Sequence, residues 1–386
     1  MENSSKGVLW FGALDALFWA FIACFAGFMS TYMLDNGMSN SFLSIMIAGY
    51  MGCSFIGAFF WGSQCDKYQT NRNVFLFAFV SCVIVAIACF YVAKVQLMLA
   101  AVLYALFGFL AIPLGSNLDA WMLKNFHKDA GMYGRARAIG SLGYAVAALI
   151  MGQCINRFGF ISMLVGILAT AVPVFVFALL TKEEKTTQKA EKKKQASAAG
   201  LFKIPTYIYM LVILLIAGLA CAPVNNLKIV YIQEVGGDVG ILGLDSFIGV
   251  TVQALFISLS GKMKKLPPYF RLTLMSVFML LDLFLIVTAS NVFMIIAGSV
   301  LWNTSYGLML PTAREITEMN VHGDLKNTAH SLADATYGSF AGIVALSYSG
   351  FLMDSFGAKF VALIGAILMV VATIMSGIKM IKEKRA

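Results

Sequence analysis

The sequence predicts an all-α membrane protein with twelve transmembrane helices in two pseudo-symmetric six-helix bundles. Of its 386 residues, 60% are hydrophobic and only 12% are charged, whereas a soluble chain would carry about 25% charged residues. A helix needs about 20 apolar residues to cross a bilayer. Twelve such runs can be placed, at 8–33, 42–61, 74–92, 96–118, 137–154, 160–181, 205–224, 240–260, 270–289, 292–311, 329–352 and 358–378.

An internal repeat predicts the two bundles. The pattern G-x-x-x-[ND]-x-F-G occurs at 152–159 and again at 350–357, and Gly62 recurs as Gly261. Both spacings are close to half the chain, which implies two related halves of the kind found in transporters. We therefore expect an N-terminal bundle over 1–181, a cytoplasmic linker over 182–203 and a C-terminal bundle over 204–386.

The basic residues predict the orientation. With the N-terminus inside, all but four of the 28 Lys and Arg residues fall in cytoplasmic segments, as the positive-inside rule requires. We expect a bacterial-type cytoplasmic (inner) membrane with both termini in the cytoplasm. Because the basic residues are spread over several loops, the net charge of +9 does not indicate nucleic-acid binding. The Lys-rich linker has too few apolar residues to fold, so we expect a flexible segment. A second possibility is that it binds the surface of an anionic membrane.

No stretch of the chain indicates an enzyme. The sequence contains no phosphate-binding loop, zinc-ligand spacing or nucleophile triad. The seven cysteines lie in or beside apolar runs without a pairing pattern. We expect no catalytic residues, no cofactor and no metal site, and without a nucleotide-binding motif the chain cannot be a primary pump by itself.

The first apolar run contains one acid, Asp15, about a third of the way across. A buried Asp without a partner is protonated or faces water. Two interpretations remain open: a hydrogen bond that packs two helices together, or a proton-binding group facing a cavity. Trp19 lies one turn further along the same face and could line that cavity.

Residues 118–144, LDAWMLKNFHKDAGMYGRARAIGSLGY, place an acid on one apolar run and an arginine on the next. Asp119 lies at the end of its run and Arg137 at the beginning of its own. Charged groups at that depth cost roughly 2.5 to 3.5 kcal/mol each unless they face a partner or a wet cavity. We predict that the two side chains pair, either to bind a substrate or only to pin neighbouring helices.

This stretch resembles helices 4 and 5 of the lactose permease (oligosaccharide:proton symporter) branch of the major facilitator superfamily. In that branch an acid-Ala-aromatic triplet, a basic loop and Phe/Tyr-Gly-Arg-Ala-Arg follow one another in this order. The resemblance implies that Asp119 and Arg137 bind sugar hydroxyls, with Ser141 one turn further on. It also implies that Tyr144 replaces the family's sugar-stacking Trp.

A second resemblance concerns residues 61–72, WGSQCDKYQTNR. They are similar to the superfamily's signature loop between helices 2 and 3, in which an acid and bases latch the cytoplasmic gate. The resemblance implies the major facilitator fold and a gate formed by Gly62, Asp66, Lys67 and Arg72. Gln69 departs from the pattern, because a glycine is usual at its position.

The second half departs from the lactose permease branch. Asn225 falls where that branch has a buried acid, and Val250 falls where it has a substrate-binding Glu. Leu301 and Thr304 replace its His and its proton-carrying Glu, and Phe278 stands near the position of its helix 9 Arg. The proton site of that branch is therefore absent from this chain.

Other titratable residues are candidates for proton coupling. Asp15 is our first choice and Asp334 the second. His330 lies four residues before Asp334 on the same helical face, so their protonation could be coupled, although the pair could equally be a helix-start cluster near the cytoplasm. Asp282, in the middle of its run, has no local partner in sequence.

Together these features predict a secondary active transporter for proton-coupled uptake of a sugar or glycoside by alternating access. We expect a monomer in membrane lipid that carries a small molecule and protons. Alternatives are a nucleoside or aromatic-acid uptake carrier, a multidrug efflux carrier with a cavity of Met and Phe, and a non-transporting membrane sensor. Amide and aromatic side chains that could also bind the substrate are Trp19, Asn225, Asn226, Gln253, Trp302 and Asn303.

Overall fold

A computed structural model describes residues 5–127, 129–183, 198–259, 263, 265–322 and 325–385. The described residues are almost entirely helical and contain no strand. They cluster into two compact units. Unit 1 is Met1–Ala190 with Asp238–Val250, and unit 2 is Glu191–Gly237 with Thr251–Ala386.

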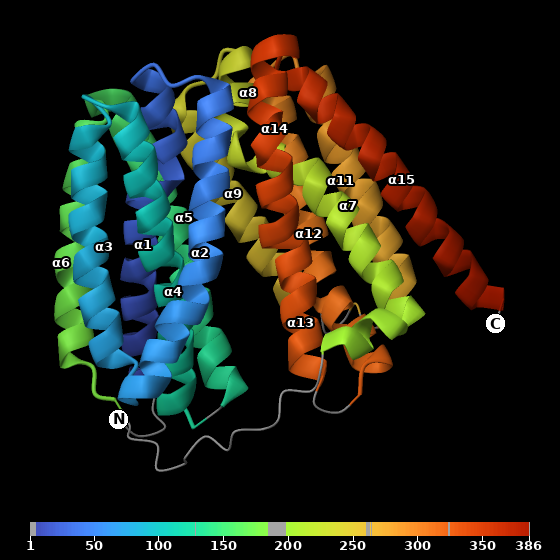
Figure 1. Ribbon diagram of the computed structural model, residues 1–386, viewed down its shortest axis with the longest axis horizontal. Helices are drawn as coiled ribbons and strands as arrows, with labels where there is room; N and C mark the ends of the chain where they lie inside the picture. The colour runs from blue at the N-terminus through green and yellow to red at the C-terminus, as the bar shows by residue number, and fades with distance from the viewer. Residues whose placement is uncertain are drawn as a thin grey trace. The chain divides into compact units, whose positions relative to one another are not determined.

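Unit 1 is a bundle of long helices (Figure 1). Its interior contains many aromatic side chains, among them the buried Phe18, Phe21, Phe75 and Phe79. Helix α1 packs along α5, α2 packs along α4, and α3 lies between α4 and α6. The helices are α1 (Ser5–Asp35), α2 (Asn40–Tyr68), α3 (Arg72–Val92), α4 (Leu97–Asn125), α5 (Ala130–Phe158) and α6 (Ile161–Leu180).

In unit 2, α11 packs against both α12 and α15, and α7 packs against α14 and α15. Helix α9 begins within unit 1 and ends within unit 2. The elements are η1 (Ala198–Lys203), α7 (Pro205–Asn226), α8 (Lys228–Glu234), α9 (Val239–Ser258), α11 (Pro268–Thr288), α12 (Val292–Asn320), α13 (Lys326–Ala335), η3 (Thr336–Phe340), α14 (Ala341–Phe356) and α15 (Ala358–Arg385).

The predicted membrane fold is confirmed. Eleven helices of the described chain are long and apolar enough to cross a membrane. The remaining predicted run, 329–352, is divided into α13, the π-helix η3 and α14, each too short to count alone. A π-helix bonds residue i to i+5 and often marks a functional position in a longer helix.

Several helices extend beyond the predicted apolar runs. The run beginning at 137 belongs to α5, which starts at Ala130 because the Asp129 carboxylate caps it. That carboxylate accepts hydrogen bonds from the backbone N–H groups of Gly131 at 2.8 Å and Met132 at 3.0 Å. A carboxylate at this position satisfies amides that have no partner within the helix. Composition therefore locates the apolar part of a span, whereas the helix continues into its polar ends.

The repeated G-x-x-x-[ND]-x-F-G pattern has the same backbone conformation in both halves. Its last glycines, Gly159 at the end of α5 and Gly357 at the end of α14, have φ of 76° and 88°. Glycine is favoured there because a Cβ atom would strain a left-handed residue. Gly261 of the second repeated pair, and residues 184–197 of the predicted linker, lie outside the described residues.

Candidate functional site

Arg137 lies between two carboxylates inside unit 1. Its Nη1 atom is 3.4 Å from Oδ2 of Asp15 on α1, and its Nε atom is 3.5 Å from Oδ1 of Asp119 on α4. The Asp15 side chain is fully buried, whereas those of Arg137 and Asp119 are 31% and 30% exposed. We call these three residues the charged triad. The triad contains the predicted Asp119–Arg137 pair and adds to it Asp15, the acid of the first span.

Two glycines of α5 allow α1 to approach closely enough for the charged triad to form. A Cβ atom at Gly140 would lie 1.8 Å from Oδ2 of Asp15, and one at Gly143 would lie 2.5 Å from Cα of Ala16. Only the absence of a side chain leaves room for the Asp15 carboxylate beside the α5 backbone. These glycines thus determine where the carboxylate meets Arg137.

Trp19 forms a wall of the charged triad. The guanidinium carbon of Arg137 lies 4.8 Å from the centre of the Trp19 ring. The far edge of the ring rests against Gly115 of α4, where a Cβ atom would be 3.1 Å away. Such a cation–π contact contributes roughly 0.5–2 kcal/mol. One ring face of Trp19 therefore holds the arginine in place and is not available for stacking on a ligand.

The charges of the triad do not balance when both acids are ionised. Two carboxylates then share one guanidinium, so one negative charge lacks a compensating positive charge in the triad. Burying an uncompensated charge is costly, and proteins relieve the cost by neutralising the group. A proton can neutralise this charge, whereas a ligand that donates hydrogen bonds can stabilise it without neutralising it.

Other side chains of α5 lie near the triad. Tyr133, one turn before Arg137, lies close enough to Asp119 to interact with it electrostatically, and it was not among the predicted site residues. The four-residue spacing to Arg137 is the signal that could have identified it. Ser141 and Tyr144 are half-buried, and the Tyr144 hydroxyl lies near Gly27 of α1, 3.6 Å from the position of a Cβ atom there.

The predicted amide ligands of unit 2 use their N–H groups within their own helices. Asn225 donates to the Cys221 carbonyl at 3.0 Å, and Asn226 donates to the Ala222 carbonyl at 2.9 Å. Asn303 likewise donates to the Ser299 carbonyl at 2.8 Å. This leaves their amide oxygens as the groups that could accept from a ligand. Gln253, on α9, is half-buried.

An aromatic cluster lies on α12 and the π-helix of unit 2. The Trp302 and Tyr306 rings are stacked with centroids 5.4 Å apart, and Tyr306 lies 5.8 Å from Tyr337 of η3. All three side chains are half-buried. Trp302 was among the predicted binding residues, whereas Tyr306 was not. Its four-residue spacing from Trp302 places it on the same face of the helix.

The unit 2 residues considered for proton coupling lie in different surroundings. His330 Nε2 lies 2.9 Å from Oε1 of Glu318 on α12, and Lys326 pairs with the same carboxylate. Asp334 is exposed on α13. Asp282 is fully buried on α11. The partner of His330 thus comes from a neighbouring helix, which sequence spacing could not reveal.

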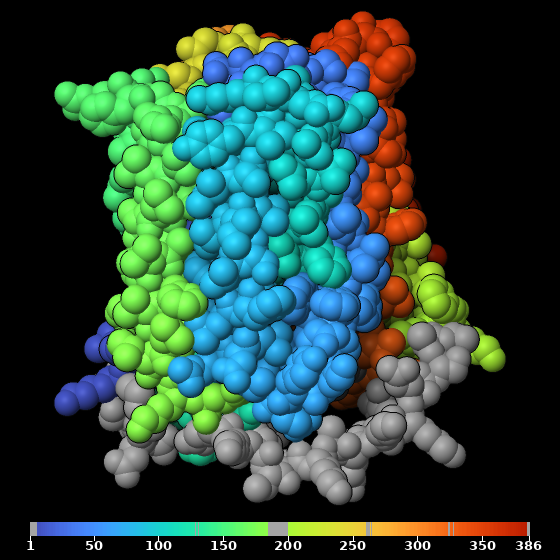
Figure 2. Space-filling model, turned by 60° about the vertical axis from the view of Figure 1, so that its left-hand side comes forward, coloured from blue at the N-terminus to red at the C-terminus, as the bar shows by residue number. Residues whose placement is uncertain are grey.

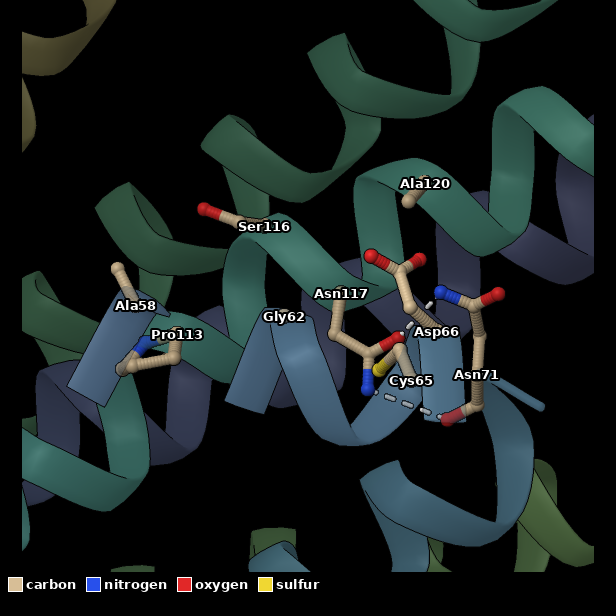
Figure 3. A pocket seen from close by; sticks show the side chains of 9 residues that line it. All are labelled: Ala58, Gly62, Cys65, Asp66, Asn71, Pro113, Ser116, Asn117 and Ala120. Atoms are coloured by element: carbon tan, nitrogen blue, oxygen red, sulfur yellow. Dashed lines mark hydrogen bonds between the residues drawn. The ribbon is translucent and has the colours of Figure 1, made fainter. Parts of the chain in front are cut away.

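The predicted gate residues lie around the loop between α2 and α3, but they contact different groups. Gly62 and Asp66 line a cavity of about 220 Å³ (Figure 3). Lys67 lies over the ring of its neighbour Tyr68 at 5.3 Å. Arg72 donates to backbone carbonyls at residues 178 and 179, at the end of α6.

Two asparagines close one side of this cavity. Asn71 Nδ2 donates to Asn117 Oδ1 at 2.7 Å, and Asn117 Nδ2 donates to the Asn71 carbonyl at 3.1 Å (Figure 3). Asn117 comes from α4, two residues before Asp119. The α2–α3 loop is therefore tied to the helix that carries one acid of the charged triad.

Glu183, just after α6, binds the other side of the loop. Its carboxylate accepts from Thr70 Oγ1 and the Asn71 N–H, both at 2.6 Å, and from Lys124 Nζ at 3.2 Å. Burial raises the pKa of Glu183, but these hydrogen bonds outweigh that effect and hold the pKa below its ordinary value. The carboxylate also lies at the N-terminus of α3, where a negative charge is favourable.

Gln69 explains why a glycine is usual in this loop. Its φ is 54°, in the left-handed region, and it ends α2. Its side chain donates to the Asp66 carbonyl at 2.5 Å. A residue with a Cβ atom costs roughly 1–2 kcal/mol in this conformation.

The family match defines the class of protein, a membrane transporter of the major facilitator type. The chain belongs to the family described as MFS_1 like family, whose profile matches residues 11–376. It is 24% identical over 307 residues to the uncharacterized transporter YwbF of Bacillus subtilis (strain 168), covering 76% of this chain and 73% of that protein.

Solved transporter structures share the fold. The nucleoside transporter NupG superposes with a TM-score of 0.81 at 14% identity, covering 96% of this chain and 98% of that one. A D-xylose-proton symporter superposes with a TM-score of 0.71 at 14% identity, covering 96% of each chain. The predicted superfamily is thus confirmed, whereas the lactose permease branch stays a prediction.

Proposed function

We propose that this chain is a secondary active transporter that couples proton entry to uptake of a sugar or glycoside. The observation that carries the proposal is the charged triad of unit 1, in which Asp15 and Asp119 share Arg137. The similarity of fold to a D-xylose-proton symporter supports the substrate class and the coupling ion. We propose that the halves 1–181 and 204–386, joined by the linker 182–203, alternate about a central site.

In this proposal Asp119 and Arg137 bind the ligand. Each is about one-third exposed, so hydroxyl groups can reach them. A guanidinium donates several hydrogen bonds in a fixed plane while a carboxylate accepts them, which suits neighbouring hydroxyls of a sugar ring. Ser141 and Tyr144, further along α5, extend the same surface.

Asp15 carries the proton in this proposal. It is fully buried and shares its guanidinium with a second carboxylate, so its negative charge is the most costly of the triad to maintain. Protonation of Asp15 leaves Arg137 paired with Asp119 alone, and the freed N–H groups of the guanidinium can turn toward the ligand. Proton binding and ligand binding are therefore coupled through one side chain.

Substitution of the arginine tests ligand binding. Arg137→Lys keeps the charge but loses the planar fork, so we expect ligand affinity to fall at least about tenfold, the effect of losing one hydrogen bond to a charged group. Expression should remain normal. Arg135→Lys, two residues earlier on an exposed face of α5, is the matched control. The ligand is first identified by counterflow with labelled D-xylose, lactose and uridine, and wild-type affinity in Arg137→Lys would remove the binding role.

Substitution of the buried acid tests coupling. Asp15→Asn should preserve counterflow, which needs no net proton movement, and should abolish accumulation driven by a pH gradient. Asp334→Asn, with its side chain exposed on α13, is the comparison. If pH-driven accumulation survives in both variants, the proton is carried elsewhere and the assignment is wrong.

A nucleoside is the second candidate substrate. The aromatic cluster of Trp302, Tyr306 and Tyr337 offers faces on which a planar base could stack, and the fold is similar to that of a nucleoside transporter. Exchange of labelled uridine but not of the sugars in the counterflow panel would select this alternative. In that case Tyr306→Ala should weaken uridine affinity while Tyr348→Ala, on α14, should not.

A further inference from the structure

A second cavity of unit 1 opens at the ends of α2 and α3. Its volume is about 510 Å³, within the range typical of ligand pockets. We call it the α2–α3 groove. The two helices that form it face the viewer in Figure 2, with α6 on the other side of α3. Neither the charged triad nor the Asp66 cavity shares a lining residue with it.

One end of the groove is apolar and faces outward. Phe60 and Phe77 line it and are 44% and 69% exposed. Both belong to helices that are long and apolar enough to cross a membrane, so their exposed faces are suited to contact with acyl chains. Trp61 forms the floor, and its indole N–H is satisfied by the Phe109 carbonyl at 3.1 Å. The floor is therefore fixed and needs no ligand hydrogen bond.

The other end of the groove is polar. Gln64, Thr70 and Asn73 line it, and Asn73 is exposed. Next to it, Lys67 holds its ammonium 5.3 Å above the ring of Tyr68, another lining residue. This end lies where α2 ends and α3 begins, which is the basic side of the spans in the predicted orientation.

We propose that the α2–α3 groove binds an anionic phospholipid. Its acyl chain lies along Phe60 and Phe77, and its phosphate is bound by the Lys67 ammonium and the Asn73 amide. The Lys67 cation beside the polar end and the apolar-to-polar order of the lining select this occupant, because both match an anionic lipid whose headgroup lies at the membrane surface. A neutral sugar would leave the exposed phenylalanine faces unmatched.

The bound lipid would also restrain the α2–α3 loop. Thr70 lines the groove and donates to Glu183 at 2.6 Å. Its hydroxyl also accepts from the Asn73 N–H at 3.2 Å. The same short segment thus contacts the lipid site, the Glu183 carboxylate and the start of α3. Occupancy of the groove is expected to raise thermal stability as well as to retain a lipid.

The proposal can be tested by adding lipid to the purified full-length protein in detergent. The lipid is either the anionic dioleoyl phosphatidylglycerol or the zwitterionic dioleoyl phosphatidylcholine. The two readouts are native mass spectrometry of retained lipid and the midpoint of thermal unfolding. We expect the anionic lipid to be retained more tightly and to stabilise more. Lys67→Gln should weaken its binding about fivefold, as expected for loss of one basic group at a membrane surface. Phe77→Ala should weaken retention of both lipids.

Two variants serve as matched controls. Lys94→Gln removes a cation at the opposite end of α3 that also lies over an aromatic ring, 5.5 Å from the centre of Phe90. Phe55→Ala removes a phenylalanine of α2 that is 44% exposed but does not line the groove. Both should retain wild-type lipid binding. Equal retention of the two lipids by wild type, or equal loss in test and control variants, would overturn the proposal. Binding of soluble glycerol phosphate with the same affinity would also overturn it, because the acyl chain would then contribute nothing.

Discussion

Gly140→Ala adds one methyl group at the point where α1 meets α5. The new Cβ atom would lie 1.8 Å from Oδ2 and 2.5 Å from Cγ of Asp15. Real Cβ atoms essentially never approach within 3.0 Å, so the oxygen must retreat by at least 3.0 − 1.8 = 1.2 Å. The contact between Asp15 and Arg137, 3.4 Å long, cannot keep its geometry through such a movement.

Overpacking at a buried contact costs about 1–3 kcal/mol. Taking about 2 kcal/mol and an unfolding entropy of roughly 2.1 cal/mol/K for each of the 386 residues, we expect the unfolding midpoint of Gly140→Ala to fall by about 2–3 °C. Gly134→Ala is the control on the same helix, because no atom lies within 4 Å of its Cβ position. It should be neutral or slightly stabilising, since alanine is the better helix former.

The assay combines scanning fluorimetry of the purified protein with pH-driven uptake of the exchanged substrate. Removal of the carboxylate should relieve the clash, so Asp15→Ala combined with Gly140→Ala should recover about 1–2 kcal/mol relative to the sum of the single changes. Uptake coupled to protons should be lost in the single and the double variant. An unchanged midpoint in Gly140→Ala, with strictly additive effects in the double variant, would refute the geometry described for the triad.

Three further predictions concern the ends of the helices. Glu183→Gln should destabilise the protein by about 0.3–1 kcal/mol at neutral pH. Because the pKa of Glu183 is held below its ordinary 4.5, the carboxylate stabilises the fold above that value. The difference from wild type should shrink as the pH of the unfolding assay falls below 4.5 and should vanish once the carboxyl is protonated in the folded protein. Gln69→Gly should raise stability by up to about 1 kcal/mol in thermal unfolding, since it removes a Cβ atom at φ of 54°; a loss would mean that the side-chain bond to Asp66 dominates. Arg271→Met should lower the free energy of unfolding by about 3 kcal/mol, because it removes the guanidinium that lies 2.7 Å from the Glu315 carboxylate. Adding Glu315→Gln to this variant should restore much of the unfolding midpoint, since no unpaired charge then remains.

The spans and the helix-ending glycines could be predicted because both depend on local sequence. Apolar run length decides whether a segment crosses a membrane, and the repeated pattern ends in a glycine with positive φ at both of its occurrences, Gly159 and Gly357. The π-helix η3 could not be predicted in this way. Its residues are ordinary helix formers apart from Gly338, and packing of the surrounding unit determines the wider turn.

The site was predicted in part for a similar reason. Asp119 and Arg137 lie on consecutive helices, so their pairing follows from the turn between them. The contact with Asp15 joins residues 122 positions apart, and only the packing of α1 on α5 through Gly140 brings it about. Lys228 illustrates the same limit: its position suggests a loop, yet it is buried and donates to Ser299 at 2.8 Å.

The unequal number of acids and bases in the charged triad has a consequence for energetics. Two carboxylates and one guanidinium carry a net charge of −1 when empty and zero when Asp15 holds a proton. In the proposed cycle a neutral solute would enter with the neutral triad, and the return step would carry the negative charge outward. Each cycle would then move one positive charge inward, so the membrane voltage would contribute about 2.3 kcal/mol per 100 mV to accumulation. Uptake would generate a current even in the absence of a pH gradient.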